Sequence, residues 1–305
     1  MIDARSVTLD DDAWALVARA LADRQGPVGG DGLLLLGNAD ADGDGAAFTM
    51  RMFNSDGTEA ETCLNGLRCV ARLGFEMLGI DRAKVRLKTS VAEVSRDPDL
   101  APGVYTVRER AGPASLAVRR WPMEGEGEQV IEAPITRLPS TRPFTAVAMP
   151  NPHLVSFVDR VDEDELTAIG EACEAAPAWL PNRANVSFVE QRGADRLFVR
   201  TFERGVGLTD SCGSAMAASA YAACLTGRTP WSAALTVLNK GGLVAACADE
   251  AGSVTLSGNA TCEWAGSIDV DLSTGAVSDL RVEQRFDGEV ASWAAVKEEA
   301  ARQAQ

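Results

Sequence analysis

Short apolar or alternating stretches, each bounded by Gly, Pro, Asp or Asn, recur along most of the chain. Such stretches predict β-strands. The predicted strands cover residues 32–36, 47–53, 84–90, 104–110, 145–149, 153–158, 185–191, 196–202, 234–239, 254–258 and 276–286. Helical patterns are fewer, and they cover residues 11–22, 163–175, the stretch after Cys63 to about Gly79, the stretch after Cys212 to about Thr226, and a charged segment from Ser292. We therefore expect an α+β protein in which strands dominate.

One arrangement occurs twice along the chain: Arg-x-Phe, then nine residues, then a cysteine that follows a hydroxyl residue. The copies lie 149 residues apart and comprise Arg51, Phe53, Thr62 and Cys63 in the first, and Arg200, Phe202, Ser211 and Cys212 in the second. A repeat of this length indicates two halves of related design. We place the N-terminal half-domain in residues 1–122 plus 265–305 and the C-terminal half-domain in residues 123–264.

In each copy we expect the hydroxyl residue to cap a helix, which places Cys63 and Cys212 at the first helical position. The positive end of a helix stabilises a thiolate, so we expect the pKa of both thiols to fall from about 8.5 toward neutrality. Free N–H groups at the same helix ends bind anions such as a carboxylate. Two such halves suit inversion at an α-carbon, with one cysteine removing a proton as thiolate and the other returning one as thiol.

Composition narrows the classes of partner. A formal net charge of -15 over 305 residues, without a basic patch, argues against binding to nucleic acid or to a membrane surface. The N-terminus lacks the features of a signal peptide, and no stretch approaches the roughly 18 apolar residues of a membrane span. Seven cysteines without close spacings indicate free thiols in a reducing compartment. We expect a cytoplasmic protein that acts on a small molecule.

At these residues the chain resembles the diaminopimelate epimerases, a family that works without pyridoxal phosphate. The resemblance runs from about Leu9 to Gly266 and depends on "ADR-x3-VGGDGLL" (22–34), "FNSDGTEAETCLNGLRC" (53–69), "NPHLVSFVD" (151–159), "NRANVSFV" (182–189), "FERGVGLTDSCGS" (202–214) and "LSGNA" (256–260). It implies two pseudo-symmetric α+β domains, each a curled, mostly antiparallel sheet around a central helix, with the active site in the cleft between them. It also implies an amino-acid substrate, no cofactor, interconversion of LL- and meso-diaminopimelate in lysine biosynthesis, and pairing into homodimers.

The resemblance also assigns roles to single residues. Cys63 and Cys212 match the catalytic acid/base pair. The residues that match those holding the distal amino and carboxylate groups of the substrate are Asn54, Asn151, Asn185, Glu203 and Arg204. The residues that match those binding the carboxylate at the reacting carbon are Asn65, Gly213 and Ser214. His153, the single histidine, is assigned either a supporting role or direct proton handling, and Leu64 stands where the family usually has Gly.

Two alternative functions stay open. Leu64, and Leu208 at a position where Glu is typical, allow an epimerase or racemase for a different amino acid. A thiol switch or binding protein of the same fold is the other alternative, because two cysteines close enough to flank one carbon could form a disulfide on oxidation.

The chain begins at a point resembling the end of the family's first strand, and we expect residues 276–286 to fill the place of that strand.

Metal sites are not expected. "DADGDG" (40–45) resembles the start of a calcium loop, but the twelfth position is Arg51 where Glu is required. Cys63, Cys69 and His153 lack the paired spacing of a zinc site. Four other cysteines are expected to be buried core residues, namely Cys173, Cys224, Cys247 and Cys262. Cys69 is expected on the inner face of its helix.

Overall fold

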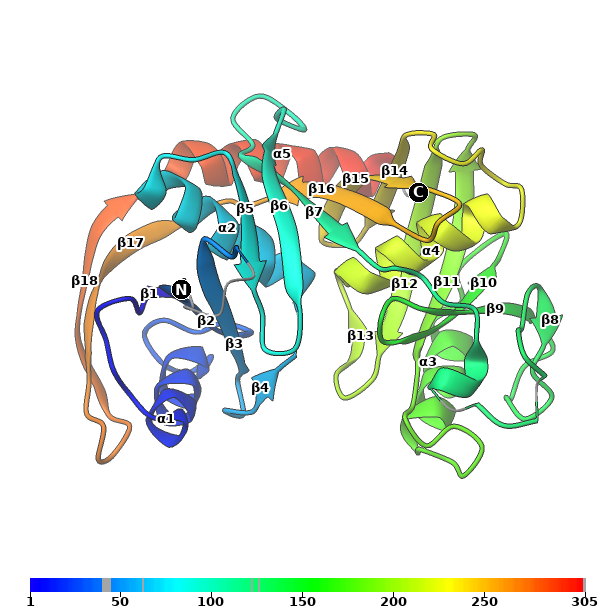
Figure 1. The fold of residues 1–305 in the computed structure, drawn as a ribbon, viewed down its shortest axis with the longest axis horizontal. Coiled ribbons are helices and arrows are strands. Elements are labelled where there is room, and N and C mark those ends of the chain that lie inside the picture. The colour runs from blue at the N-terminus through cyan, green and yellow to red at the C-terminus, as the bar shows by residue number, and fades with distance from the viewer. Residues whose placement is uncertain (40–44, 62, 122, 126, 304–305) are drawn as a thin grey trace. The chain divides into compact units, whose positions relative to one another are not determined.

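The computed structural model describes residues 1–39, 45–61, 63–121, 123–125 and 127–303 (Figure 1). The helices of this part are α1 (Asp11–Ala22), α2 (Leu64–Leu78), α3 (Glu163–Glu174), α4 (Gly213–Leu225) and α5 (Asp287–Gln303), with a 3-10 turn at Val118–Arg120. Four of the predicted helices are confirmed, whereas α5 begins at Asp287 and not at Ser292. The calcium-like stretch 40–44 and the predicted cap Thr62 lie outside the described residues.

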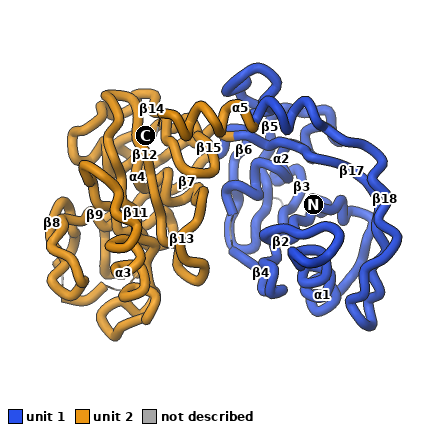
Figure 2. The backbone as a smooth tube through the Cα atoms, turned by 180° about the vertical axis from the view of Figure 1, so that it is seen from behind, with its two compact units in different colours: residues 1–109, 259–293 blue, residues 110–258, 294–305 orange. Residues whose placement is uncertain are grey.

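Two compact units divide the chain (Figure 2). Unit 1 comprises residues 1–109 and 259–293, and unit 2 comprises residues 110–258 and 294–305. The chain therefore passes between the units at residues 109–110, 258–259 and 293–294, the last of these within α5. The domain boundaries expected from the sequence stay a prediction.

Unit 1 is built on a sheet with the strand order β1-β2-β3-β5-β6-β7. Its strands are β1 (Ile2–Asp3), β2 (Gly32–Asn38), β3 (Phe48–Asn54), β4 (Glu59–Ala60), β5 (Arg82–Arg86), β6 (Val91–Asp97) and β7 (Thr106–Ala111). The β1–β2 and β3–β5 pairs are parallel, and the other pairs are antiparallel. Leu33 and Leu35 pack with α1 while Leu36 packs with α2, because successive strand residues face opposite sides. The unbroken apolar run of β2 thus serves two core clusters.

Unit 2 is built on a sheet with the strand order β16-β15-β14-β12-β11-β10-β9-β8. Its strands are β8 (Ala133–Pro134), β9 (Pro143–Ala148), β10 (Pro152–Phe157), β11 (Asn185–Gly193), β12 (Arg196–Glu203), β13 (Gly207–Thr209), β14 (Leu235–Asn239), β15 (Gly242–Ala248) and β16 (Val254–Asn259). The β10–β11 and β12–β14 pairs are parallel, and the other pairs are antiparallel.

The central helix of unit 2 is α4, which is buried along most of its length and contacts β9, β10, β11, β12, β14 and β15. Its Ala-rich sequence has no polar face, which is typical of a helix enclosed on all sides. In unit 1, α2 contacts β2, β3, β5 and β6 in the same manner. The predicted α+β fold, a mostly antiparallel sheet around a central helix in each half, is confirmed.

The C-terminal segment forms a hairpin of its own, β17 (Trp264–Val270) paired with β18 (Val277–Arg285). Ile268, Val270 and Val277 pack on the cluster that contains α1, and Glu289 of α5 accepts a hydrogen bond from Arg72 of α2 at 2.8 Å. The strand expected within residues 276–286 is therefore confirmed, and it lies on unit 1. Among the described residues it pairs with β17 and with no strand of the β1–β7 sheet, and the idea that it replaces a family strand stays a prediction.

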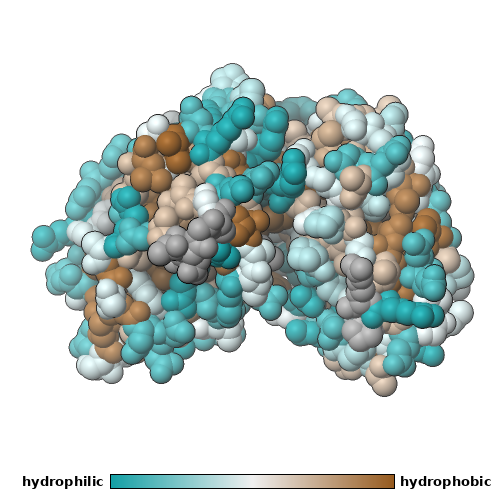
Figure 3. Space-filling view, viewed as in Figure 1, coloured by the Kyte–Doolittle hydropathy of each residue, from teal (hydrophilic) through white to brown (hydrophobic). Residues whose placement is uncertain are grey.

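Hydrophilic residues cover most of the face drawn in Figure 3, and the apolar areas on that face are separate from one another. No helix among the described residues is both long and apolar enough to cross a membrane.

Candidate active site

The repeated sequence folds in the same way in both units. In unit 1, Met52 of β3 pairs with Ala60 of β4, and in unit 2 Thr201 of β12 pairs with Thr209 of β13, so that the register is also displaced by 149 residues. Each hairpin leads through a short connection into a cysteine and then into the central helix. The repeat therefore encodes a strand, a hairpin and a helix start, and it places one cysteine at the same point in each unit.

The two arginines that begin the repeat, Arg51 and Arg200, make equivalent contacts in the two units. Arg51 donates a hydrogen bond to Asp11, the first residue of α1, at 2.7 Å. Arg200 donates to Glu163, the first residue of α3, also at 2.7 Å. Arg200 also donates to the carbonyl of Thr209 at 2.6 Å, three residues before the cysteine. Each arginine therefore connects the hairpin of its unit to the first residue of a second helix, which is α1 in unit 1 and α3 in unit 2.

The capping pattern predicted from the sequence is wrong. Cys63 and Cys212 are the N-cap residues themselves, with extended backbones (φ -149° and -125°), and the helices begin at Leu64 and Gly213. Sγ of Cys63 takes the place of a capping oxygen and accepts a hydrogen bond from the Gly66 amide at 3.3 Å. The Ser211 hydroxyl instead accepts a hydrogen bond from Asn239 at 3.3 Å.

The predicted fall in thiol pKa is also wrong. Burial raises the pKa of Cys63 to about 11, and the opposing effects of the Gly66 amide and Arg68 are smaller. Burial, and then the Glu203 carboxylate, raise the pKa of the Cys212 thiol, which is 8% exposed. The helix ends do favour the thiolates, but desolvation of a buried charge is the larger effect. Both thiols are therefore protonated at neutral pH.

In unit 1 the predicted residues lie at the start of α2 and in the β3–β4 turn. Asn65 follows the cap in the first turn of α2, and its amide oxygen accepts a hydrogen bond from Arg68 at 2.8 Å. Leu64 packs against the core cluster of unit 1. Asn54 closes the turn, where its side chain donates to the Thr58 hydroxyl at 3.0 Å. The turn role of Asn54 is thus established, and substrate binding by Asn54 stays a prediction.

In unit 2 a chain of side chains leads away from Cys212. Its sulfur lies 3.6 Å from the Ser214 hydroxyl, which accepts a hydrogen bond from the Asn151 amide at 3.3 Å. The Asn151 oxygen lies 3.1 Å from Nε2 of His153, which is fully buried. Burial lowers the pKa of His153 to about 3, so the ring is neutral at physiological pH. A neutral imidazole that orients Asn151 fits the supporting role.

The remaining predicted residues of unit 2 gather beside this chain. Asn185 of β11 lies opposite His153 of β10, and its oxygen accepts a hydrogen bond from the Arg204 backbone amide at 3.0 Å. Glu203 accepts a hydrogen bond from the Thr209 hydroxyl and is close enough to Cys212 to raise the pKa of that thiol. Gly213 is the first residue of α4. Unit 2 thus brings an amide, a carboxylate and a thiol together at the start of α4, and the Arg204 guanidinium donates a hydrogen bond to the Asn182 carbonyl at 3.0 Å.

Sequence reasoning missed a buried ion pair beneath Cys63. Arg68 of α2 donates to Glu109 of β7 at 2.6 Å, and both side chains are almost completely buried. The signal was present, because Arg68 follows Asn65 by three residues, a spacing that places two residues on one helix face. Of the other cysteines, Cys173 and Cys224 are buried as expected, whereas Cys69, Cys247 and Cys262 are only partly buried.

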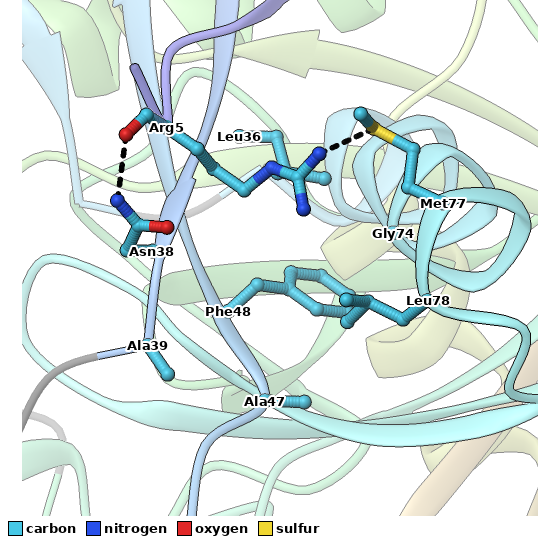
Figure 4. A pocket seen from close by; sticks show the side chains of 9 residues that line it. All are labelled: Arg5, Leu36, Asn38, Ala39, Ala47, Phe48, Gly74, Met77 and Leu78. Carbon is cyan, nitrogen blue, oxygen red and sulfur yellow. Dashed lines mark hydrogen bonds between the residues drawn. The ribbon is translucent and has the colours of Figure 1, made fainter. Parts of the chain in front are cut away.

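A cavity of about 300 Å³ lies at the other end of α2 (Figure 4). It is lined by Arg5, Asn38, Phe48 and Met77, among others, and the Arg5 guanidinium donates a hydrogen bond to the Met77 sulfur at 3.4 Å. Gly74, also in the lining, follows Cys63 by eleven residues, so the helical rise puts them about 16 Å apart. This cavity is therefore separate from the cysteine end of the helix.

Comparison with known proteins shows which family the chain resembles. The family model for diaminopimelate epimerase matches residues 145–263. A diaminopimelate epimerase of Clostridium acetobutylicum is 37% identical over 267 residues, which cover 86% of this chain and 79% of that relative. One of Listeria innocua is 35% identical over 279 residues, which cover 88% and 84%.

The fold also has a solved counterpart. A predicted epimerase from Pseudomonas aeruginosa superposes with a TM-score of 0.59 at 17% identity, over 85% of this chain and 88% of that one. Identity this low shows the fold alone, whereas the two sequence relatives match over most of their length. With more than a third of the aligned residues identical to theirs, and with a cysteine capping the central helix of each unit, this chain belongs to the diaminopimelate epimerase family.

Proposed function

We propose that this chain interconverts LL- and meso-diaminopimelate by a two-base reaction in which Cys63 and Cys212 are the acid/base pair. The observation that carries the proposal is the repeated placement of a cysteine at the N-cap of each central helix, in a member of this family. Helix N-termini bind carboxylates through their free amides, so each cysteine lies where an amino-acid carboxylate would be held.

The proposed step moves one proton from the α-carbon to one sulfur atom and one proton from the other sulfur atom to the opposite face of that carbon. The thiolate of one cysteine removes the α-proton, and the electron pair left behind is delocalised into the carboxylate. The thiol of the other cysteine then donates its proton to the opposite face of the carbon. The first cysteine ends as thiol and the second as thiolate, so the reverse reaction uses the same groups with exchanged roles. Amide groups at the helix ends would stabilise the charge that develops on the carboxylate.

The raised thiol pKa values predict a pH dependence. Because the reaction needs one thiolate and one thiol, its rate depends on the protein form that has lost one of the two protons. Since burial raises the pKa of both thiols, that form is scarce at pH 7 and increases about tenfold per pH unit. We expect kcat/KM for LL-diaminopimelate to rise continuously from pH 6 to pH 9, measured by loss of optical rotation. A plateau already at pH 6–7 would contradict the raised values.

The proposal is tested by incubating reduced protein with LL-diaminopimelate in deuterated water. The expected products are meso-diaminopimelate and deuterium at the α-carbon, detected by chiral chromatography and mass spectrometry. If neither product appeared but another amino acid incorporated deuterium at its α-carbon, the proposed substrate would be wrong and the proposed mechanism would stand. Failure with every amino acid tested, and reversible closure of a Cys63–Cys212 disulfide, would favour a thiol switch.

Recognition of the second amino-acid head is assigned to Glu203 and Arg204. Replacing Arg204 with methionine is expected to lower kcat/KM about 100-fold, chiefly through KM, because a charge-assisted hydrogen bond to the distal carboxylate is lost. Arg142→Met is the matched control, since Arg142 pairs with Glu165 of α3 at 2.7 Å and belongs to no predicted site. Steady-state kinetics of the two variants against wild type would decide, and equal losses in both would reject the assignment.

The proposal also covers the location of the protein, its ligands and its oligomeric state. It includes a cytoplasmic location, in keeping with seven free cysteines. It also includes an amino-acid substrate and no cofactor. Finally, it includes a homodimer, which sedimentation equilibrium of the reduced protein would test.

A further inference from the structure

One arginine side chain joins three segments of unit 1 at the start of α2. The guanidinium of Arg68 donates to the Glu109 carboxylate at 2.6 Å, to the Asn65 amide oxygen at 2.8 Å and to the Asn259 carbonyl at 3.2 Å. A planar guanidinium presents its donors from three separate nitrogen atoms in fixed directions, whereas a lysine ammonium presents all of its donors from one nitrogen. The position of Asn65 is therefore set by contacts that lie beneath the helix and away from solvent.

Two of these acceptors stand at the ends of chain segments. Glu109 is the last residue of unit 1 before the chain passes into unit 2, and Asn259 is the first residue after it returns. The same guanidinium thus fixes both points to the helix that Cys63 caps. Arg72, one turn further along α2, donates to the Ala260 carbonyl at 2.8 Å and holds Glu289, but it contacts neither Asn65 nor Glu109 in the described part of the chain.

Glu109 is an unusual acceptor. Its side chain is fully buried, and Oε2 has no hydrogen-bond partner among the residues that the structure describes. Burial raises the pKa of this carboxyl to about 7, against the opposing effect of Arg68. The charged and titratable groups that act on Cys63 are Glu109, which raises the pKa of the thiol, Arg68, which lowers it, and Cys69, which raises it. The pair therefore acts on both the geometry and the charge around Cys63.

We propose that Arg68 and Glu109 are positioning residues for the Cys63 end of the site: Arg68 fixes the Asn65 amide, and Glu109 holds the Arg68 guanidinium and places a buried negative charge near the start of α2. The catalytic part of this inference rests on the proposed function, whereas the effect on the thiol does not. A purely structural brace would change stability and leave the ionisation of Cys63 unaltered, so the two interpretations differ in a measurable way.

Two conservative variants separate the roles. Glu109→Gln keeps an oxygen that can accept from Arg68 but removes the negative charge. Arg68→Lys keeps the positive charge but loses the three-way geometry. The readout is the pH midpoint of Cys63 alkylation by iodoacetamide in reduced protein, measured peptide by peptide with mass spectrometry. Cys173 of unit 2 is the internal reference, and Arg72→Lys on the same helix is the control variant.

Glu109→Gln is expected to lower the Cys63 midpoint by about one pH unit, because a neighbouring negative charge is removed. Arg68→Lys is expected to leave the midpoint nearly unchanged and to reduce kcat/KM about tenfold. An unaltered midpoint in Glu109→Gln, or an equal shift in Arg72→Lys, would overturn the proposal. If wild-type protein lacked epimerase activity, the proposed function would fail while the alkylation midpoints would still decide the role of Glu109.

Discussion

Replacing Cys212 with serine is expected to reduce epimerisation about 1,000-fold, because a hydroxyl is a far weaker acid than a thiol and its alkoxide, the form needed as base, is not populated near neutral pH. The same loss is expected for Cys63→Ser. Exchange of the α-proton with solvent should behave differently, since one thiol remains in each variant. Each variant is expected to retain α-proton exchange for the one stereoisomer that presents its proton to the surviving cysteine. Deuterium uptake and chiral analysis of the same reaction measure both quantities.

Matched controls exist on the same two helices. Cys224→Ser lies on α4 and Cys69→Ser lies on α2, and each should leave epimerisation within about twofold of wild type. If Cys63→Ser and Cys212→Ser each retained full epimerisation, the two-base mechanism would be rejected. If both variants lost exchange for both stereoisomers alike, the two cysteines would not act on opposite faces of the carbon.

The hydrophobic pattern was sufficient to locate the elements that build both units. "GLLLL" was recognisable as a strand because β2 is covered on both faces, which demands an unbroken apolar run. Strands β6 and β15 were missed because neither contains an unbroken run of strongly apolar, strand-forming residues. β15 reads GLVAACA, in which Ala and Cys have weak strand preference, although every second residue is buried. Only the pairing with β14 and β16 makes this segment a strand.

The cysteine positions were predictable because a repeat of 149 residues is visible without a structure. Their capping geometry was not, since a sulfur that accepts the Gly66 amide is a rarer cap than a hydroxyl. The direction of the pKa shift failed for a related reason. Helix-end stabilisation can be inferred from sequence, whereas desolvation depends on what packs around the thiol. Buried partners such as Arg68 and Glu109, 41 residues apart, likewise become visible only once α2 and β7 are packed together.

Replacing Arg68 with methionine is expected to destabilise the protein by about 3–5 kcal/mol at pH 8, because it leaves the buried Glu109 carboxylate without its charge partner. The cost should depend on pH with a definite sign. Burial raises the pKa of Glu109 in the folded protein above its value in the unfolded chain, and loss of Arg68 raises it further. The folded state then binds more protons than the unfolded state, so the stability of the variant should increase as the pH falls from 8 toward 5. Urea unfolding at several pH values measures this dependence.

The double variant Arg68→Met/Glu109→Gln completes the cycle. Removing the carboxylate abolishes the buried charge, so the double variant is expected to be more stable at pH 8 than Arg68→Met alone and to lose its pH dependence over this range. Arg108→Met is the control on the same strand, because Arg108 pairs with Asp97 at 2.7 Å with half of its side chain exposed, and such a pair contributes about 1 kcal/mol or less. A pH-independent cost in Arg68→Met would mean that Glu109 is not charged in the folded protein. The charge that Cys63 experiences would then have to come from elsewhere in unit 1.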